Sequence, residues 1–123
     1  MTVSRIAINV YRARPDKEVV LLSELRDHQS LLWSEGLATD LEPIVMRAGD
    51  GTLIEIFQWA SAKAIEDAHR NARVQAAWGR LEACAEFVPL AEVAGADRPF
   101  SDFERVSLAQ APIPQPDPAH REE

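Results

Sequence analysis

Two histidines and one carboxylate are the side chains in this chain with the most chemical potential. Glu55 lies between Leu53 and Phe57, a setting in which a bare carboxylate is costly to bury. His28 and His69 both fall on the apolar sides of predicted helices. A carboxylate can orient an imidazole, and an imidazole can move a proton near neutral pH. His28, Glu55 and His69 are therefore the candidate catalytic residues, with a histidine as general base.

Three other interpretations of these side chains stay open. Both histidines could be satisfied packing residues of the core. Glu55 could form an ion pair with an arginine of the first strand or with one across a dimer interface. His28, Glu55 and His69 could also form a facial metal triad, but their spacing matches no local motif such as H-E-x-x-H. We therefore expect no metal site.

The tryptophans are large side chains that could line a ligand pocket. Trp59 ends a predicted strand, where it could lie at a pocket mouth or at a dimer interface. Trp78 continues the apolar stripe of its helix, which favours core packing, whereas Trp33 falls outside the main stripe of its own helix. Trp59 and Trp78 are taken as candidate substrate contacts.

Composition and charge limit the class of protein and its partners. The chain has 123 residues, of which 46% are hydrophobic and 27% charged, which fits one globular domain. Its net charge is −7 and its lysines and arginines do not cluster, so we expect neither nucleic acid nor a membrane surface as a partner. We find no signal peptide and no membrane-spanning stretch, and expect a cytoplasmic protein. Cys84 is the single cysteine and is expected to be a buried thiol.

Hydrophobic periodicity predicts the order strand, helix, strand, strand, helix pair, strand. The predicted strands cover residues 3–14, 44–48, 52–59 and 87–93. The first predicted helix covers residues 16–35, and two further helices begin after residues 61 and 71. Asp16, Ser61 and Asn71 are the predicted N-caps, and Gly36 is the predicted end of the first helix. This order is the split βαβ pattern of the ferredoxin-like fold, an α+β structure with a four-stranded antiparallel sheet and helices on one face.

The predicted strand 52–59 has two largely apolar faces. One face carries Leu53, Glu55, Phe57 and Trp59, and the other carries Thr52, Ile54, Ile56 and Gln58. Two helical segments can cover only one face of such a sheet, so the other face requires a second chain. The sequence therefore predicts a homodimer, and Glu55 can reach a pocket if its face is the one under the helices.

Three regions of different character follow one another along the chain. Residues 1–95 are predicted to form the ferredoxin-like domain. Residues 96–108 carry apolar side chains without a clear period and are predicted to be an arm that docks onto the domain or its partner. Residues 109–123 hold several prolines and little apolar bulk, which predicts a flexible proline-rich tail.

Three segments of the chain resemble a known protein family. They are YRARPDKEVVLLSELRDH, IEIFQWASAKAIEDAH and VQAAWGRLEACAEFVPLAEV, and they lie within the run from Tyr11 to Val93, which covers about two thirds of the chain. They resemble the antibiotic-biosynthesis monooxygenase-like proteins of the dimeric α+β barrel superfamily. The resemblance implies a homodimer in which two sheets stack into a barrel, with a pocket between the sheet and the helices of each subunit.

The resemblance also implies candidate chemistry. The superfamily includes cofactor-independent monooxygenases, which deprotonate an electron-rich ring so that it reacts with oxygen. A haem-degrading branch uses an Asn of the first strand with a Trp and a His of later helices. Asn9, Trp78 and His69 supply these residue types, so Asn9 joins the candidate substrate contacts. In that branch the Trp precedes the His, whereas here His69 precedes Trp78, which argues against haem degradation.

The sequence thus favours a dimeric barrel that binds a small, mostly apolar organic molecule and needs no cofactor. Its expected activity is cofactor-independent oxygenation of an aromatic or polyketide-like substrate, or a related proton transfer, with His28 or His69 as base. The alternative is a non-catalytic ligand-binding or stress-response barrel in which the histidines only pack.

Overall fold

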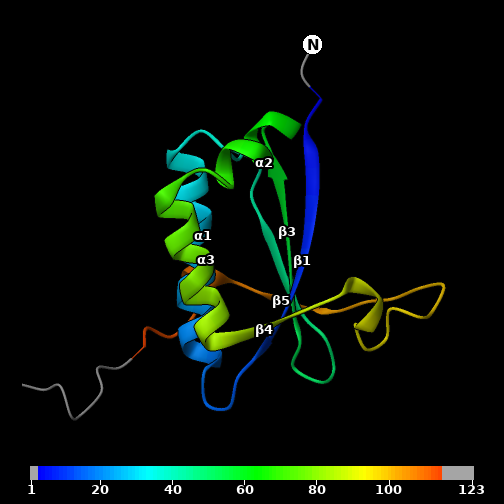
Figure 1. Cartoon of the computed structure of the whole chain (residues 1–123). Coiled ribbons are helices and arrows are strands. Elements are labelled where there is room, and N and C mark those ends of the chain that lie inside the picture. Colours follow the sequence, from blue (N-terminus) through cyan, green and yellow to red (C-terminus); the bar gives the residue numbers. More distant parts are fainter. Residues whose placement is uncertain (1–2, 115–123) are drawn as a thin grey trace, which may run out of the picture.

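The computed structural model describes residues 3–114 as an α+β structure with one antiparallel sheet (Figure 1). Its strands are β1 (Arg5–Ala13), β2 (Ile44–Arg47), β3 (Leu53–Trp59), β4 (Ala85–Val88) and β5 (Glu104–Val106). They lie in the order β4-β1-β3-β2-β5, and every neighbouring pair is antiparallel. The order of β1 to β4 is compatible with the predicted ferredoxin-like fold.

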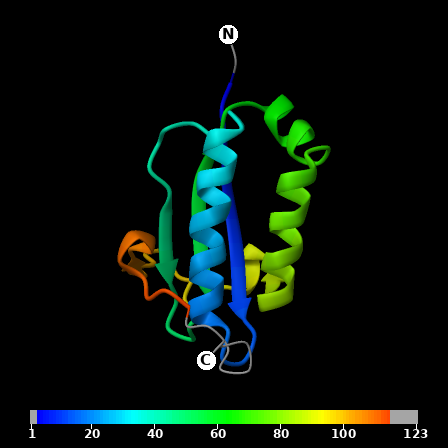
Figure 2. The ribbon, with the colours of Figure 1, turned by 90° about the vertical axis from the view of Figure 1, so that its left-hand side faces the viewer.

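Three helices lie on one face of the sheet, with the long pair α1 and α3 side by side (Figure 2). They are α1 (Glu18–Ser34), α2 (Ala62–Ala68) and α3 (Ala72–Cys84). Ser61 accepts a hydrogen bond from the backbone N–H of Ala64 at 3.1 Å, and Asn71 accepts one from that of Val74 at 3.1 Å. Both predicted N-caps are therefore confirmed.

The two ends of α1 differ in how well the sequence predicts them. Gly36 follows the helix with a φ of 72°, which confirms it as the residue that ends the helix. The prediction that Asp16 caps the start was wrong. Asp16 lies in the preceding turn with a φ of 62°, and the N-cap is Lys17, whose side chain makes no capping hydrogen bond.

Leucines of α1 pack against the helix-facing side of β3. Leu21 and Leu25 share a buried cluster with Leu53 of β3 and with Cys84, which confirms the expected buried thiol. Burying such side chains in place of leaving them in water supplies most of the stability of a domain this size. Because side chains alternate along a strand, Glu55 lies on the same face as Leu53, under the helices.

The sheet has one strand more than the four that the sequence predicts. β5 comes from the predicted arm, residues 96–108, and pairs with β2 so that Val106 lies opposite Val45. The fourth strand also differs from its prediction, because β4 ends at Val88. Pro89 has no N–H to continue the ladder, and a short 3₁₀ helix, Leu90–Glu92, follows it.

The predicted tail, residues 109–123, falls only in part within the described residues. It starts inside a second short 3₁₀ helix, Leu108–Gln110, and Ala111 packs against the core cluster that contains Leu21. Residues 115–123 lie outside the part of the chain that the structure describes. Among residues 3–114, none of the helices has the length and apolar character needed to cross a membrane.

The sheet face away from the helices is partly covered by the chain itself. The segment after β4 lies on this side (yellow in Figure 1), and its Val93 and Phe103 pack against Val10 and Ile54. The premise that this chain could cover only one face of the sheet was therefore wrong in part. The apolar side chains that stay exposed on this face, here called the isoleucine patch, are Ile6 (56% exposed), Ile8 (45%) and Ile44 (42%).

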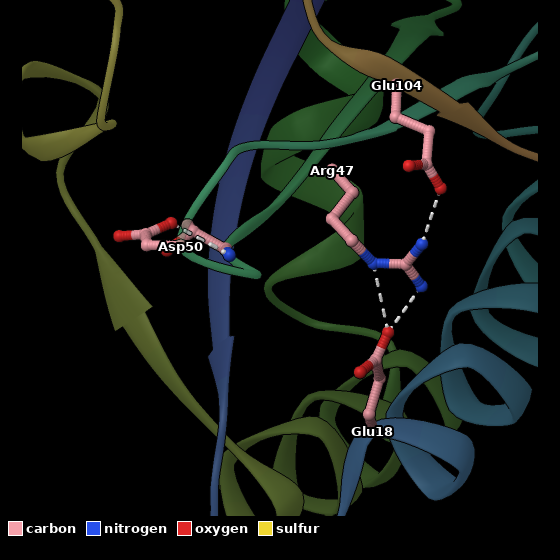
Figure 3. A network of polar contacts seen from close by, with 5 residues as sticks. Glu18, Arg47, Asp50 and Glu104 are labelled. Carbon is pink, nitrogen blue, oxygen red and sulfur yellow. Dashed lines mark hydrogen bonds and ion pairs between the residues drawn. The ribbon is translucent and has the colours of Figure 1, made fainter.

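An arginine of β2 links β5 to the start of α1 (Figure 3). The guanidinium of Arg47 donates to the carboxylate of Glu18 and, through Nη1, to that of Glu104 at 2.8 Å. In the adjacent turn, Asp50 accepts a hydrogen bond from the backbone N–H of Thr52 at 3.0 Å, and this bond lowers the pKa of Asp50. Arg47 thus holds the edge strand against the domain.

Replacing Arg47 with methionine is expected to loosen β5 more than it destabilises the whole domain. The ion pairs are partly exposed, so the free energy of unfolding should fall by only about 0.5 to 1 kcal/mol. Amide exchange at residues 104–106 should become at least severalfold faster, because the edge strand opens locally. Hydrogen-exchange mass spectrometry measures both effects, and Arg105→Met, which removes a long, exposed contact with Glu42, is the control. Equal amide exchange at residues 104–106 in the two variants would contradict the role of Arg47 in holding β5.

Candidate functional site

Glu55 is fully buried at the centre of β3, and its carboxylate accepts hydrogen bonds from three side chains. Tyr11 Oη donates to Oε1 at 2.8 Å, and Asn9 Nδ2 donates to the same oxygen at 3.3 Å. Gln29 Nε2, from α1, donates to Oε2 at 3.0 Å. The alternation of β1 places Asn9 and Tyr11 on one face, and the pairing of Asn9 with Glu55 brings that face to the carboxylate. A buried carboxylate with this many donors is held as an acceptor in a fixed orientation.

These neighbours set the protonation of Glu55 and Tyr11. Burial by itself raises the pKa of Glu55, but His28, Gln29 and Tyr11 together outweigh it and bring the pKa below its ordinary value. Burial, followed by the charge of Glu55, raises the pKa of Tyr11 far above its ordinary value. Glu55 is therefore the ionised acceptor of the pair, and the Tyr11 hydroxyl keeps its proton and donates.

His28 is buried beside Glu55 with its two ring nitrogens in unlike environments. Trp78 Nε1 donates to His28 Nε2 at 3.0 Å, so Nε2 acts as an acceptor and the ring proton belongs on Nδ1. Nδ1 lies 3.8 Å from Glu55 Oε2, beyond hydrogen-bond distance, and it is the one buried side-chain polar atom among residues 3–114 without a hydrogen-bond partner. His28 thus connects the carboxylate to Trp78, but its lone pair is already in use.

His69 is exposed at the C-terminal end of α2, where one of its nitrogens is left free. Its Nδ1 lies 2.8 Å from the carbonyl oxygen of Ile65, which can only accept, so the ring proton belongs on Nδ1. Its ring packs edge-on against Trp78 with centroids 5.0 Å apart. Within the described residues, Nε2 of His69 makes no hydrogen bond. His69 is therefore an oriented imidazole with an available lone pair.

A pocket of about 400 Å³ brings most of the candidate residues together. Its lining takes residues 8–11 of β1, from both faces of that strand, together with the end of β3, the helices, and the segment that follows β4. The candidate residues in its lining are Asn9, His28, Trp59, His69 and Trp78, joined by apolar and aromatic side chains such as Tyr11, Phe57, Leu81, Phe87 and Leu90. Glu55 does not line the pocket. It lies behind Asn9 and Tyr11 and acts on the pocket through them and through His28.

The contacts of Glu55 test two of the alternatives that the sequence leaves open, the ion pair with an arginine and the metal triad. Among residues 3–114, the ion pairs of Glu55 include no arginine, so the alternative of an ion pair with an arginine of the first strand does not hold. His28, Glu55 and His69 do not gather into a group that could hold a metal ion, and neither do any three His, Cys, Asp or Glu side chains of the described residues. The carboxylate of Glu55 is instead surrounded by the neutral hydrogen-bond donors Asn9, Tyr11 and Gln29 and by the imidazole of His28.

Two residues of this site were missed in the sequence. Tyr11 lies two residues after Asn9 and therefore on the same face of β1, a signal that strand alternation alone could have supplied. Gln29 gave no comparable signal, because it lies on the polar edge of a long helix and reaches Glu55 only through the packing of α1 on the sheet.

Comparisons with protein-family models, with curated proteins and with solved structures found no match to this chain. The resemblance to the antibiotic-biosynthesis monooxygenase-like family therefore stays a prediction, and the function must be argued from the site.

Replacing Tyr11 with phenylalanine is expected to lower the free energy of unfolding by about 1.5 to 3 kcal/mol, because a buried carboxylate loses its shortest hydrogen bond. The aromatic ring stays, so its edge-on contact with Phe87 is preserved. Urea denaturation followed by circular dichroism measures the change. A loss smaller than about 0.5 kcal/mol, within the range of ordinary surface changes, would mean that the hydroxyl does not stabilise Glu55.

Proposed function

We propose that the protein binds a small, mostly apolar aromatic molecule in the pocket of about 400 Å³ and acts as a cofactor-independent monooxygenase, with His69 as the general base. The observation that carries the proposal is the free Nε2 of His69, held at a pocket whose other walls are mainly apolar and aromatic. A general base needs a lone pair within reach of the substrate and a fixed ring orientation, and His69 has both.

The chemistry follows from the lining residues. A phenolic O–H of the bound ring gives its proton to His69 Nε2, and the resulting imidazolium stabilises the phenolate beside it. The electron-rich anion adds molecular oxygen at a ring carbon that carries a hydrogen, and the imidazolium returns its proton to give a hydroperoxide. Loss of water from the hydroperoxide leaves a carbonyl at that carbon, so one oxygen atom enters the product and the other leaves as water. The substrate itself supplies the electrons, so no metal or organic cofactor enters the scheme. A mostly apolar pocket excludes water and strengthens the ion pair between imidazolium and phenolate.

His28 and Glu55 have a positioning role in this proposal. Glu55 fixes Asn9 and Tyr11, and His28 accepts the indole N–H of Trp78, which in turn packs against His69. This chain of contacts holds the ring of His69 toward the pocket. His28 itself becomes a base only if Trp78 moves away from its Nε2.

A second candidate function is a non-catalytic ligand-binding barrel. The occupied lone pair of His28 and the exposure of His69 favour it, because the two could then be a packing residue and a surface residue. In this case ligands bind the pocket without losing a proton.

A homodimer with stacked sheets is part of the same proposal. The isoleucine patch leaves three large apolar side chains in water on the face away from the helices, and a second copy would bury them. Membership in the antibiotic-biosynthesis monooxygenase-like family, whose members pair through this face, is proposed on the same ground and on the compatible strand order.

Replacing Ile8 with lysine is expected to convert the dimer into a monomer, because a charge would be buried at the centre of the interface. Light scattering at micromolar concentration should give twice the chain mass for the unsubstituted protein and the chain mass for Ile8→Lys. Leu41→Lys is the control, since Leu41 is exposed away from this face and should leave the dimer intact. A monomer without any substitution would remove the dimer from the proposal.

Native mass spectrometry of freshly purified protein tests whether the pocket holds a ligand. We expect a co-purified or added naphthalene-sized phenol to be retained at one molecule per chain. Leu90→Trp, which enlarges an exposed residue of the pocket wall, should lower retention at least tenfold. Equal retention by the protein and by this variant would place the ligand elsewhere and contradict the proposal.

A further inference from the structure

A second and larger hollow lies on the other side of α1 from the pocket. It is a groove of about 780 Å³ between the second half of α1, the loop of residues 38–43, and the edge formed by β2, β5 and the 3₁₀ helix after β5. Among the described residues, Phe57 is the one that lines both the groove and the pocket. A volume in this range is typical of small-molecule sites, so the groove is large enough for a ligand of its own.

The side-chain amide of Gln29 presents a hydrogen-bond acceptor at the inner end of the groove. Its amide nitrogen donates to Glu55 Oε2 at 3.0 Å, and a carboxylate can only accept, so the amide cannot be turned the other way. The amide oxygen makes no hydrogen bond within the described residues, and it is not among the buried unpaired atoms. Because Gln29 lines the groove, its oxygen is an accessible acceptor oriented there by Glu55.

The rest of the lining favours an uncharged ligand with an apolar body. Arg26 donates to the backbone carbonyl of Leu108 at 3.1 Å, and Arg105 lies 3.9 Å from Glu42, so both cations have partners within the chain. Asp40 and Glu42 balance these two charges, which leaves the groove without a net charge to attract an ion. The apolar surface available to a ligand comes mainly from Trp33, Leu41, Val106 and Leu108, because Leu32, Val45 and Phe57 belong to the lining but are almost fully buried.

We propose that this groove is a second ligand site, for a neutral, flat and mostly apolar molecule that donates one hydroxyl hydrogen bond to the amide oxygen of Gln29. The ring of such a molecule lies along Trp33 and the apolar wall, and its hydroxyl points to the inner end. Glu55 orients the recognising group without touching the ligand. The site is independent of the reaction proposed for the pocket.

Titration of ¹⁵N-labelled protein with 1-naphthol, followed by two-dimensional NMR, tests the site directly. Trp33 lines only the groove and Trp78 lines only the pocket, so their indole N–H signals report the two hollows separately. We expect saturable shifts of the Trp33 indole and of the Gln29 side-chain amide. 1-Methoxynaphthalene has the same ring and no donor, and it should bind about fivefold more weakly, the value of one net hydrogen bond.

Two variants and one control sharpen the titration. Gln29→Met keeps the length of the side chain and removes the acceptor, so 1-naphthol and 1-methoxynaphthalene should bind this variant equally. Ser30→Trp fills the groove from an exposed position of α1 and should abolish the Trp33 shift, even if Gln29→Met fails to fold. Asp27→Trp places the same bulk on an exposed residue outside the groove lining and should bind like the unsubstituted protein.

Several outcomes overturn the proposal. A shift of Trp78 without a shift of Trp33 means that 1-naphthol occupies only the pocket, which supports the proposed function and removes the second site. A Trp33 signal that shifts with protein concentration means that the groove is an interface between copies. Equal affinity for the two probes in the unsubstituted protein removes the role of Gln29, and no saturable shift removes the site altogether.

Discussion

Replacing Glu55 with alanine is expected to lower the free energy of unfolding by about 3 to 5 kcal/mol near neutral pH, the range for breaking a buried charged network from one side. Glu55 is fully buried, and its removal leaves the donors Tyr11, Asn9 and Gln29 without their acceptor. Urea denaturation followed by circular dichroism measures the loss. A fall in the free energy of unfolding of less than about 1 kcal/mol, the effect of an average substitution, would contradict a stabilising role for the hydrogen-bond network of Glu55.

Glu55→Gln is the matched variant, because it keeps the shape, removes the charge, and turns one of the two accepting oxygens into an NH2 group that cannot accept a hydrogen bond. The pKa of Glu55 in the folded protein lies below its ordinary value of 4.5, so the ionised carboxylate stabilises the fold at every pH above that value. This stability is lost as the pH falls through the lower pKa of the folded state. The difference in unfolding free energy between the protein and Glu55→Gln should therefore be constant above about pH 5 and shrink in acid. A difference that grows in acid would mean that Glu55 is held protonated.

Replacing His69 with alanine is expected to lower cofactor-independent oxygenation by about 100- to 10,000-fold, the range for the loss of a general base. His69 is exposed, so the substitution should leave the fold intact. Oxygen uptake with 1,4-naphthohydroquinone, corrected for uptake without protein, measures the effect together with ¹⁸O incorporation from ¹⁸O₂ into the product. Simple oxidation to the quinone releases hydrogen peroxide and incorporates no oxygen. Arg70→Ala, an exposed neighbour outside the pocket lining, is the control and should be unchanged.

Added imidazole separates a base from a merely structural residue. In His69→Ala, free imidazole can enter the space that the ring leaves and accept the proton, so part of the lost rate should return. If His69→Ala takes up oxygen as fast as the unsubstituted protein, His69 is not the general base. No recovery with imidazole would limit His69 to positioning.

Much of the fold was predictable because its signals are local. Ser61 and Asn71 cap helices through residues three positions away, and Gly36 ends α1 through its own backbone. β5 could not be found in this way. Its three residues have no alternating pattern of their own, and they become a strand only because β2 offers an unpaired edge and Arg47 holds Glu104 there. Pro89 lies inside the predicted strand 87–93, yet its missing N–H ends β4 at Val88.

The candidate site was predictable in its residue types but not in its connections. Strand alternation places Glu55 under the helices, and helical spacing turns His28 inward, so their proximity follows from the fold. The hydrogen bond from Trp78 to His28 joins residues 50 positions apart and depends on how α3 packs beside α1. That one bond occupies the lone pair of His28 and leaves His69 as the available base, a distinction that spacing alone does not contain.

Anaerobic absorption spectroscopy of bound 1,4-naphthohydroquinone tests the proposed proton transfer most directly, because the first step then occurs without oxygen. Mixing with excess protein below the pH at which the free compound ionises should produce the spectrum of its anion. The same mixture with His69→Ala should give the spectrum of the neutral compound. If the bound compound stays neutral in the unsubstituted protein as well, the pocket binds without taking the proton, and the non-catalytic function is the correct one.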